Sequence, residues 1–201
     1  MEFAISRIIE SKKLTDTVYK MTFMSENAQF SAPGQYAIVH HEGENIQIPV
    51  AEYDSDRFIL AFNIDTDSKK SLSELKVGET VVIETGVGEG FDVEIIPDKV
   101  TLVAEGMGIP PMIGLLRKLL ISGKDYNLIL CFPNKQGIFM IEQFRNLCSN
   151  IDIITIDGSN GREGHSYDAF RKAGYVLAFA EPDVLEKIKA KAEDSQLIAL
   201  L

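Results

Sequence analysis

The chain has 201 residues, of which 45% are hydrophobic and 25% charged, a composition typical of a globular protein with a sizeable core. There is no run of about eighteen apolar residues and no signal-peptide pattern, so we expect no membrane span, no secretion and a cytoplasmic location. The formal net charge of −10 repels phosphate backbones and anionic lipids, which argues against nucleic acid and membranes as partners.

The first half of the sequence alternates apolar and polar residues between turn signals, a pattern typical of antiparallel β-strands. A short helix is expected at Ser71–Leu75, and the pattern changes near Pro97–Asp98. We therefore predict an N-terminal antiparallel six-stranded β-barrel domain over residues 1–97. Its strands are expected within residues 4–11, 18–25, 36–42, 46–53, 57–64 and 80–86.

The second half alternates apolar runs with amphipathic segments, which indicates strands alternating with helices. Such alternation favours right-handed crossovers and a doubly wound, five-stranded parallel nucleotide-binding domain over residues 98–201. The expected strands are Val100–Ala104, Asn127–Phe132, Ile151–Ile156, Tyr175–Ala180 and Gln196–Leu200. The expected helices are near Pro111–Ser122, Met140–Cys148, Tyr167–Lys172 and Pro182–Ala192.

One segment, VTLVAEGMGIPPMIGLLRKLL, combines a buried strand, a glycine-containing turn and an amphipathic helix. Gly106 and Gly108 supply the turn, and a proline suits the first helical turn. A helix N-terminus behind glycines can receive a phosphate. An ordinary strand-to-helix crossover without a ligand has the same pattern, so both interpretations stay open.

Few other residues suggest chemistry. Cys131 and Cys148 lack metal-ligand spacing, so we expect reduced, partly buried thiols and no metal site. His40–His41 follows a predicted strand without other metal ligands nearby, which favours a solvated strand end. No nucleophile elbow or Walker loop is present, and no catalytic residue is assigned.

Five short motifs follow one another along most of the chain. They are Ala32–Tyr36 (APGQY), Ser73–Glu79 (SELKVGE), Thr85–Phe91 (TGVGEGF), Leu102–Pro111 (LVAEGMGIPP) and Asp157–Gly164 (DGSNGREG). In this order they resemble the ferredoxin–NADP reductase superfamily and, within it, most of all the electron-transfer subunits of bacterial dihydroorotate dehydrogenase. The corresponding family patterns include P-G-Q-F/Y, G-P-L-G-x-G-F, L-V-G-G-G-I-G-V-A-P and D-G-S-x-G-x-K-G.

The resemblance implies a flavin-dependent oxidoreductase or electron-transfer component. In that family the barrel holds FAD, the second domain binds NAD(P)H, and a hydride passes to the flavin between the domains. A redox partner subunit or a homodimer is implied. The alternative is a cofactor-depleted paralogue that acts as a structural or regulatory subunit, because several side chains expected at the sites are replaced.

The family motif Arg-Pro-x-Ser contacts FAD, and here the matching stretch, Ile48–Ala51, has lost both polar groups. Losing the arginine removes about 1.5–3 kcal/mol, or roughly ten- to a hundredfold in affinity. Two lysines before a serine at a helix start can replace it in part; alternatively, residues 65–70 form only a solvated polar loop. The expected FAD-binding residues are Pro49, Val50, Ala51, Ile64, Lys69, Lys70 and Ser71.

The resemblance places NAD(P)H at the turn after Val100–Ala104, where Glu105 stands in place of a glycine. A carboxylate about 4 Å from a pyrophosphate costs about 1–4 kcal/mol, unless Glu105 points away or binds a ribose hydroxyl. The loop Asp157–His165 corresponds to one near the adenosine end of the nucleotide; it either contacts the nucleotide or is a glycine-rich surface loop. The expected NAD(P)H-binding residues are Gly106, Gly108, Pro111, Ser159 and Arg162, with His165 as a further contact.

Two other features of the resembling proteins are replaced. Phe179 stands where the family has a cysteine beside the nicotinamide, so that thiol is missing. The electron-transfer subunits carry a cysteine-rich tail that ligates a [2Fe–2S] cluster, which needs four thiolates, whereas this sequence has two cysteines. We therefore expect no iron–sulfur cluster in this chain.

Overall fold

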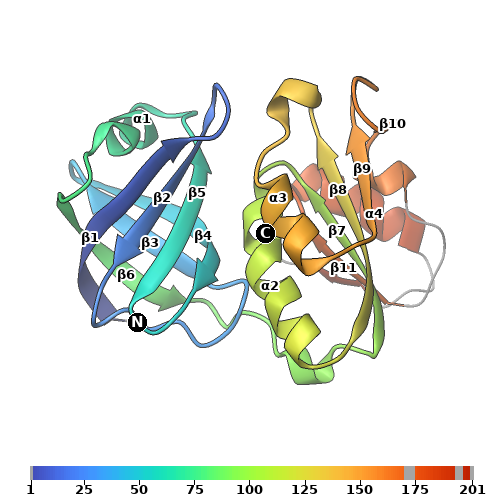
Figure 1. The fold of residues 1–201 in the computed structure, drawn as a ribbon, viewed down its shortest axis with the longest axis horizontal. Coiled ribbons are helices and arrows are strands. Elements are labelled where there is room, and N and C mark those ends of the chain that lie inside the picture. The colour runs from blue at the N-terminus through green and yellow to red at the C-terminus, as the bar shows by residue number, and fades with distance from the viewer. Residues whose placement is uncertain (1, 170–174, 193–196, 200–201) are drawn as a thin grey trace. The chain divides into compact units, whose positions relative to one another are not determined.

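The computed structural model describes residues 2–169, 175–192 and 197–199. The chain divides into two units, Met1–Phe91 and Asp92–Leu201. The first is a closed barrel and the second a parallel sheet with helices on its faces (Figure 1). The predicted fold class is thus confirmed. Within the described part of the chain, no helix is both long enough and apolar enough to cross a bilayer.

The barrel is built from the six strands that the alternating pattern predicts. Neighbouring strands are antiparallel, in the order β1-β2-β5-β4-β3-β6, and pairing of β1 with β6 closes the ring. Register shifts interrupt β1, β3 and β4, and such bulges help a sheet to curve. The strands are β1 (Glu2–Lys13), β2 (Val18–Met24), β3 (Tyr36–His41), β4 (Glu44–Tyr53), β5 (Arg57–Asn63) and β6 (Thr80–Val87).

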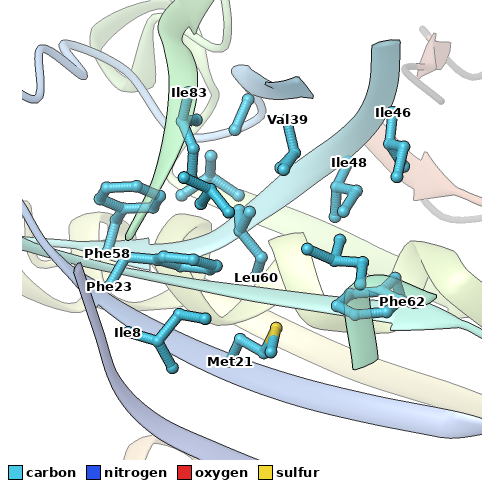
Figure 2. Close-up of a cluster of buried hydrophobic side chains, with 14 residues drawn as sticks. Ile8, Met21, Phe23, Val39, Ile46, Ile48, Phe58, Leu60, Phe62 and Ile83 are labelled. Atoms are coloured by element: carbon cyan, nitrogen blue, oxygen red, sulfur yellow. The ribbon is translucent and has the colours of Figure 1, made fainter. Parts of the chain in front are cut away.

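The barrel core consists of the apolar side chains that alternate inward along these strands. Phe23 and Phe58 stack with ring centroids 5.3 Å apart, and both are fully buried. Aliphatic side chains from the other strands converge on the same interior (Figure 2). The labelled residues of this core are Ile8, Met21, Phe23, Val39, Ile46, Ile48, Phe58, Leu60, Phe62 and Ile83.

The short helix between β5 and β6 is longer than predicted. Helix α1 spans Asp67–Glu74, so it begins before the predicted start at Ser71. Thr66 caps it, because the Thr66 side chain accepts a hydrogen bond from the Lys69 amide at 3.2 Å. Leu72 is fully buried in the barrel core and anchors the helix. The polar-loop interpretation of residues 65–70 is therefore wrong for most of that stretch.

The second unit contains a parallel sheet in the order β10-β9-β8-β7-β11-β12. All five predicted strands are present, and the two-residue strand β10 extends one edge beyond the prediction. The chain order reverses at β7, which is the topological switch point where doubly wound sheets bind ligands. The strands are β7 (Lys99–Glu105), β8 (Asp125–Phe132), β9 (Ile151–Thr155), β10 (Arg162–Glu163), β11 (Tyr175–Phe179) and β12 (Leu197–Ala199).

Helices cover the two faces of this sheet. One face packs against α4 and η4 through a buried cluster that includes Val103, Ala178 and Ile188. Helices α2 and α3 lie on the other face (Figure 1). Of the predicted helix Tyr167–Lys172, the described part is the 3₁₀ turn η4, and residues 170–172 lie outside the described residues. The helical segments are η1 (Val93–Ile95), η2 (Gly106–Gly108), α2 (Ile109–Ile121), η3 (Lys135–Gly137), α3 (Ile141–Leu147), η4 (Ser166–Asp168) and α4 (Pro182–Ala192).

Candidate functional site

Gln35, in the APGQY motif, joins two loops of the barrel. Its Oε1 accepts hydrogen bonds from the backbone amides of Ser31 at 2.8 Å and Ala32 at 3.2 Å. Its Nε2 donates to the carbonyl of Gly88 at 2.9 Å. Because Gln35 is 5% exposed, these bonds replace water that the amide would otherwise need. The hydrogen bonds of Gln35 therefore explain the APGQY motif by the structure of the barrel alone, without a ligand.

The segment expected to contact FAD from β4 has apolar side chains, and most of their surface is buried. Val50 is 4% exposed and Ala51 is fully buried, while Pro49 is half-buried. The Val50 amide donates to the Gln35 carbonyl at 3.0 Å, and the register with β5 shifts between Val50 and Glu52. No charged side chain stands at these three positions to pair with a phosphate.

The other residues predicted for FAD lie around α1, but their surroundings differ from the expectation. Lys69 lies in the first turn of the helix, where its amide bonds to the cap, and Ser71 lies further inside. Lys69 Nζ pairs with Asp65 Oδ1 at 2.8 Å, and Ser71 Oγ is 2.9 Å from His41 Nε2. Lys70 is exposed and forms no ion pair with a described residue. Lys70 is therefore a cation on α1 that remains available to an anion.

Ile64 and the start of α1 complete this region of the barrel. Ile64 is half-buried against the barrel core, and its amide donates to the Thr17 carbonyl at 2.8 Å. The exposed carboxylates of Asp65 and Asp67 flank the helix start, and Asp67 lies in the first turn. Acidic residues there interact favourably with the helix dipole, but their negative charge repels an approaching phosphate.

The two histidines at the end of β3 are not a simple solvated strand end. His40 Nδ1 is 2.7 Å from Asn45 Oδ1, and the His40 ring packs against Phe3 with centroids 5.5 Å apart. His41 is held by Ser71. Both histidines are half-buried, so they tie β3 to β4 and α1.

In the second unit, Gly106 and Gly108 form the turn between β7 and α2, as predicted. Gly106 has φ +59°, and a Cβ there would meet no atom within 4 Å. A Cβ on Gly108 would lie 2.1 Å from the carbonyl oxygen of Phe179. Gly108 is thus required for close packing against β11, whereas Gly106 leaves its turn open to a ligand.

The start of α2 has fewer amide donors than an ordinary helix. Pro110 and Pro111 are buried in the first turn and have no N–H, and the Ile109 amide is bonded to the Gly106 carbonyl. The family pattern has alanine where Pro110 stands. An anion at this turn would therefore depend mainly on the amides of Gly106–Gly108.

Glu105 ends β7 and points away from this turn. Its Oε2 accepts hydrogen bonds from the Ser166 amide at 3.0 Å and from Ser166 Oγ at 2.5 Å. Its Oε1 is 2.9 Å from His165 Nδ1. Glu105 is 8% exposed and Ser166 fully buried. The carboxylate therefore has partners, and the predicted repulsion of a pyrophosphate is reduced.

His165 and its neighbours continue this polar cluster to α4. The ring of His165 stacks on Tyr167 with centroids 4.8 Å apart. The ammonium groups of Lys187 and Lys191 lie 5.1 and 5.3 Å from the centre of the Tyr167 ring. Lys191 also pairs with Asp168 at 2.6 Å, and this bond is the main cause that lowers the pKa of Asp168.

Ser159 and Arg162, both predicted to contact a nucleotide, are engaged by neighbouring groups. Ser159 Oγ donates to Asp157 Oδ1 at 2.6 Å and accepts from the Lys135 amide at 2.7 Å. The bonds from Ser159 lower the pKa of Asp157. Arg162 pairs with Asp152 at 3.0 Å. The cation expected to meet a phosphate is thus part of an exposed ion pair.

The two cysteines are free thiols, as predicted. Cys131 is buried next to Glu105, and desolvation together with this neighbouring carboxylate raises its pKa to about 12. Such a thiol is a poor nucleophile at neutral pH. The described residues contain no group of three or more histidine, cysteine or acidic side chains placed to hold a metal.

Sequence reasoning missed the Glu105 cluster, because Glu105 and His165 lie sixty positions apart in the chain. The one available signal was that Glu105 departs from the glycine of the resembling motif. This difference gives no expectation about Ser166, because none of the five motifs includes that residue.

No family model matches the sequence. The chain is similar to the electron transfer subunit of dihydroorotate dehydrogenase B (NAD(+)) from Listeria monocytogenes serotype 4b, with 27% identity over 194 residues, covering 92% of this chain and 74% of that protein. The corresponding Clostridium acetobutylicum subunit is 26% identical and covers 98% of this chain and 80% of its own length.

Solved structures share the fold at lower identity. An NADH-dependent reduced ferredoxin–NADP oxidoreductase superposes with a TM-score of 0.86 and 21% identity, over 98% of this chain and 75% of that one. A ferredoxin NADP⁺ reductase from Neisseria gonorrhoeae with bound FAD and NADP gives 0.82 and 14%, over 100% and 98%. The chain therefore has the two-domain ferredoxin reductase-like fold and distant sequence similarity to dihydroorotate dehydrogenase electron-transfer subunits.

Proposed function

We propose that this protein is a flavin-dependent electron-transfer component of the ferredoxin reductase type, in which NAD(P)H reduces a bound FAD. The observation that carries this proposal is that sequence similarity and fold similarity both extend over more than nine-tenths of the chain. When bound, FAD would accept a hydride and pass electrons on. Because the similar proteins are named as subunits, we also propose a protein partner that receives the electrons.

The second unit carries the residues that fit a dinucleotide best. Gly106 is open, its positive φ suits the turn, and the carboxylate of Glu105 is turned away. These features support binding of NAD(P)H at the end of β7 through the amides of Gly106–Gly108. Pro111 would contribute a fixed helix start rather than a hydrogen bond.

The fit of FAD to the barrel depends on backbone groups and on exposed lysines such as Lys70. Within Pro49–Ala51 only the half-buried Pro49 has apolar surface to present to the flavin, and Lys70 is an exposed ammonium on α1. A bound pyrophosphate would also face Asp65 and Asp67. We therefore expect FAD to be held more weakly than by a barrel with an arginine at position 48.

A second function, that of a cofactor-depleted structural or regulatory subunit, is favoured by this same barrel chemistry. The acidic start of α1 and the pairing of Lys69 with Asp65 remove positive potential where a pyrophosphate would need it. The fold is then kept while the cofactor is lost.

The visible spectrum of the purified protein separates the two functions. Absorption bands at about 370 and 450 nm that bleach on addition of NADH support the flavoprotein. A colourless protein that is not stabilised by added FAD supports the subunit without cofactor. The criterion is sensitive, since a ligand at about a hundred times its Kd stabilises the fold by about 2.7 kcal/mol.

If FAD binds, Lys70→Ala should weaken it by roughly tenfold, because Lys70 supplies the free charge. Lys69→Ala should have a smaller effect, because Asp65 already neutralises Lys69. Lys12→Ala, at an exposed position on β1, is the control for the loss of one charge. Equal FAD affinities for all three variants in a fluorescence titration would exclude a phosphate contact by Lys70.

A further inference from the structure

The strongest unassigned feature is the cluster of Glu105, His165 and Ser166 at the carboxyl end of β7. The resembling motif has glycine at the position of Glu105, and a glycine has no side chain to accept these hydrogen bonds. The contacts with His165 and Ser166 therefore depend on a side chain that the resembling motif lacks.

The carboxylate determines which nitrogen of His165 carries the proton. A carboxylate can only accept, and Glu105 Oε1 lies 2.9 Å from Nδ1. Its Oε2 is already bonded to the amide and the hydroxyl of Ser166. Nδ1 is therefore the donor in this contact, which leaves Nε2 of the neutral ring as an acceptor. The backbone amide of Asp168 does not compete for a ring nitrogen, because it donates to the His165 carbonyl at 2.9 Å.

The imidazole is fixed in orientation as well as in tautomer. Its ring stacks on Tyr167 at an interplanar angle of 10°. The backbone amide of His165 donates to Asp168 Oδ2 at 3.3 Å, and Lys191 holds Asp168 from α4. Residues of β7 and η4 thus contact the ring directly, and α4 contacts Asp168 and Tyr167 beside it.

The remaining nitrogen is accessible. The side chain of His165 is 34% exposed, and Nε2 forms no hydrogen bond with a described residue. It lies in the loop after β10, close to the end of β7, where the chain order of the sheet reverses. Doubly wound sheets bind their ligands at this end.

We propose that Glu105 is a positioning residue that holds His165 as the Nδ1–H tautomer, so that Nε2 accepts a hydrogen bond from a nucleotide ligand, through a donor such as a ribose hydroxyl. The identity of the ligand as a pyridine nucleotide rests on the proposed function. The tautomer and its cause rest only on the contacts within this unit.

The opposite role, in which Glu105 repels the nucleotide, conflicts with the geometry. Glu105 has the same parity along β7 as Val103, which belongs to the cluster on the α4 face of the sheet. Its charge is directed to three donors on that face and away from the open turn at Gly106. Removing the carboxylate should therefore weaken nucleotide binding.

The first test is a measurement of the histidine tautomers by ¹⁵N NMR on the unaltered protein. We expect His165 to be protonated at Nδ1. Glu105→Gln should diminish that preference, because the glutamine oxygen would accept from the donors of Ser166 and its NH₂ group, which can only donate, would face Nδ1. Glu163→Gln is the matched control, since it removes one charge from the adjoining strand β10 at an exposed position. A His165 protonated at Nε2 in the unaltered protein would overturn the proposal, whatever the variants do.

The second test is a titration with NADH. We expect the ¹⁵Nε2 resonance of His165 to move on binding, Glu105→Gln to bind about tenfold more weakly, and Glu163→Gln to bind like the unaltered protein. Tighter or unchanged binding by Glu105→Gln would reject the positioning role. If the unaltered protein does not bind NADH, the ligand and the proposed function both fail, and the tautomer measurement still decides whether Glu105 orients His165.

Discussion

At the scale of single residues, two glycines in one turn have different physical reasons. Gly106 is needed for a backbone conformation with positive φ, whereas Gly108 is needed because the Phe179 carbonyl leaves no room for a Cβ. The sequence motif shows both glycines alike. The distance between the turn and β11 separates the two roles.

This difference predicts unequal costs of substitution. Gly106→Ala should lower the free energy of unfolding by about 1–2 kcal/mol, the cost of a left-handed conformation for alanine. Gly108→Ala should cost about 3 kcal/mol or more, since the contact is with backbone that cannot rotate away. Urea unfolding gives both values.

Gly123→Ala is the matched control for this comparison, because Gly123 has φ +67° and open space around it. It should behave like Gly106→Ala. If Gly108→Ala is no more destabilising than these two variants, the close approach of the turn to β11 is wrong.

The expectations about single binding residues could not include their ion pairs and hydrogen bonds, because a linear motif does not show which side chains lie nearby. Arg162 was expected to meet a phosphate, and its pairing with Asp152 joins two adjacent strands. Lys69 and Asp65 are four positions apart and pair across the start of α1, so that local ion pair could have been predicted. The bond between His165 and Glu105 could not, because it needs the tertiary fold.

At the scale of elements, the start of α1 was not predicted correctly from the sequence. One of the two open interpretations makes residues 65–70 a polar loop, yet Thr66 at this position is a capping signal. The strands were predicted well because alternation follows directly from having one buried face. Strand β10 was missed, since two exposed residues carry no hydrophobic pattern.

The link between η4 and α4 should be sensitive to pH. The pKa of Asp168 is lowered, chiefly by its hydrogen bond with Lys191. The pair therefore stabilises the fold fully above the ordinary aspartate pKa of 3.8, and it loses that contribution as pH falls through the lowered pKa. Lys191→Met should therefore destabilise the protein at pH 7, by about 0.5 kcal/mol because both groups are largely exposed.

Chemical unfolding at pH 7 and at about pH 3 measures this difference. Lys189→Met is the control, since Lys189 pairs with Glu186 on the same helix at a similarly exposed site. The cost of Lys191→Met should shrink in acid. A cost that is the same at both pH values would show that Lys191 acts through its packing on Tyr167 rather than through Asp168.

At the scale of the whole molecule, each unit has its own buried core. The barrel core and the cluster beneath α4 share no residue. This organisation followed from the sequence, because the period of the hydrophobic pattern changes between the two halves. What stayed beyond sequence reasoning was the set of contacts made by buried polar side chains such as Gln35 and Glu105.

Separate cores predict separate patterns of amide hydrogen exchange. Phe58→Ala removes one ring of the stacked pair and should cost about 3–5 kcal/mol. The loss of protection should be greatest in the barrel strands, with β7 and β8 as the internal reference. Phe144→Ala, at a fully buried position on α3, should give the reverse pattern.

Exchange followed by mass spectrometry resolves these segments. If both variants lower protection equally in the barrel strands and in the parallel sheet, the two cores do not unfold as separate units.

The pairing of β1 with β6 has a consequence for how another macromolecule can recognise the barrel. Every strand of the ring already has two neighbours, so no row of unpaired backbone donors and acceptors is left as a template. Recognition by strand addition is therefore unavailable there. A binding molecule must therefore contact the side chains and loops of the barrel. The specificity of such binding depends on residues that can be substituted without a change in the backbone.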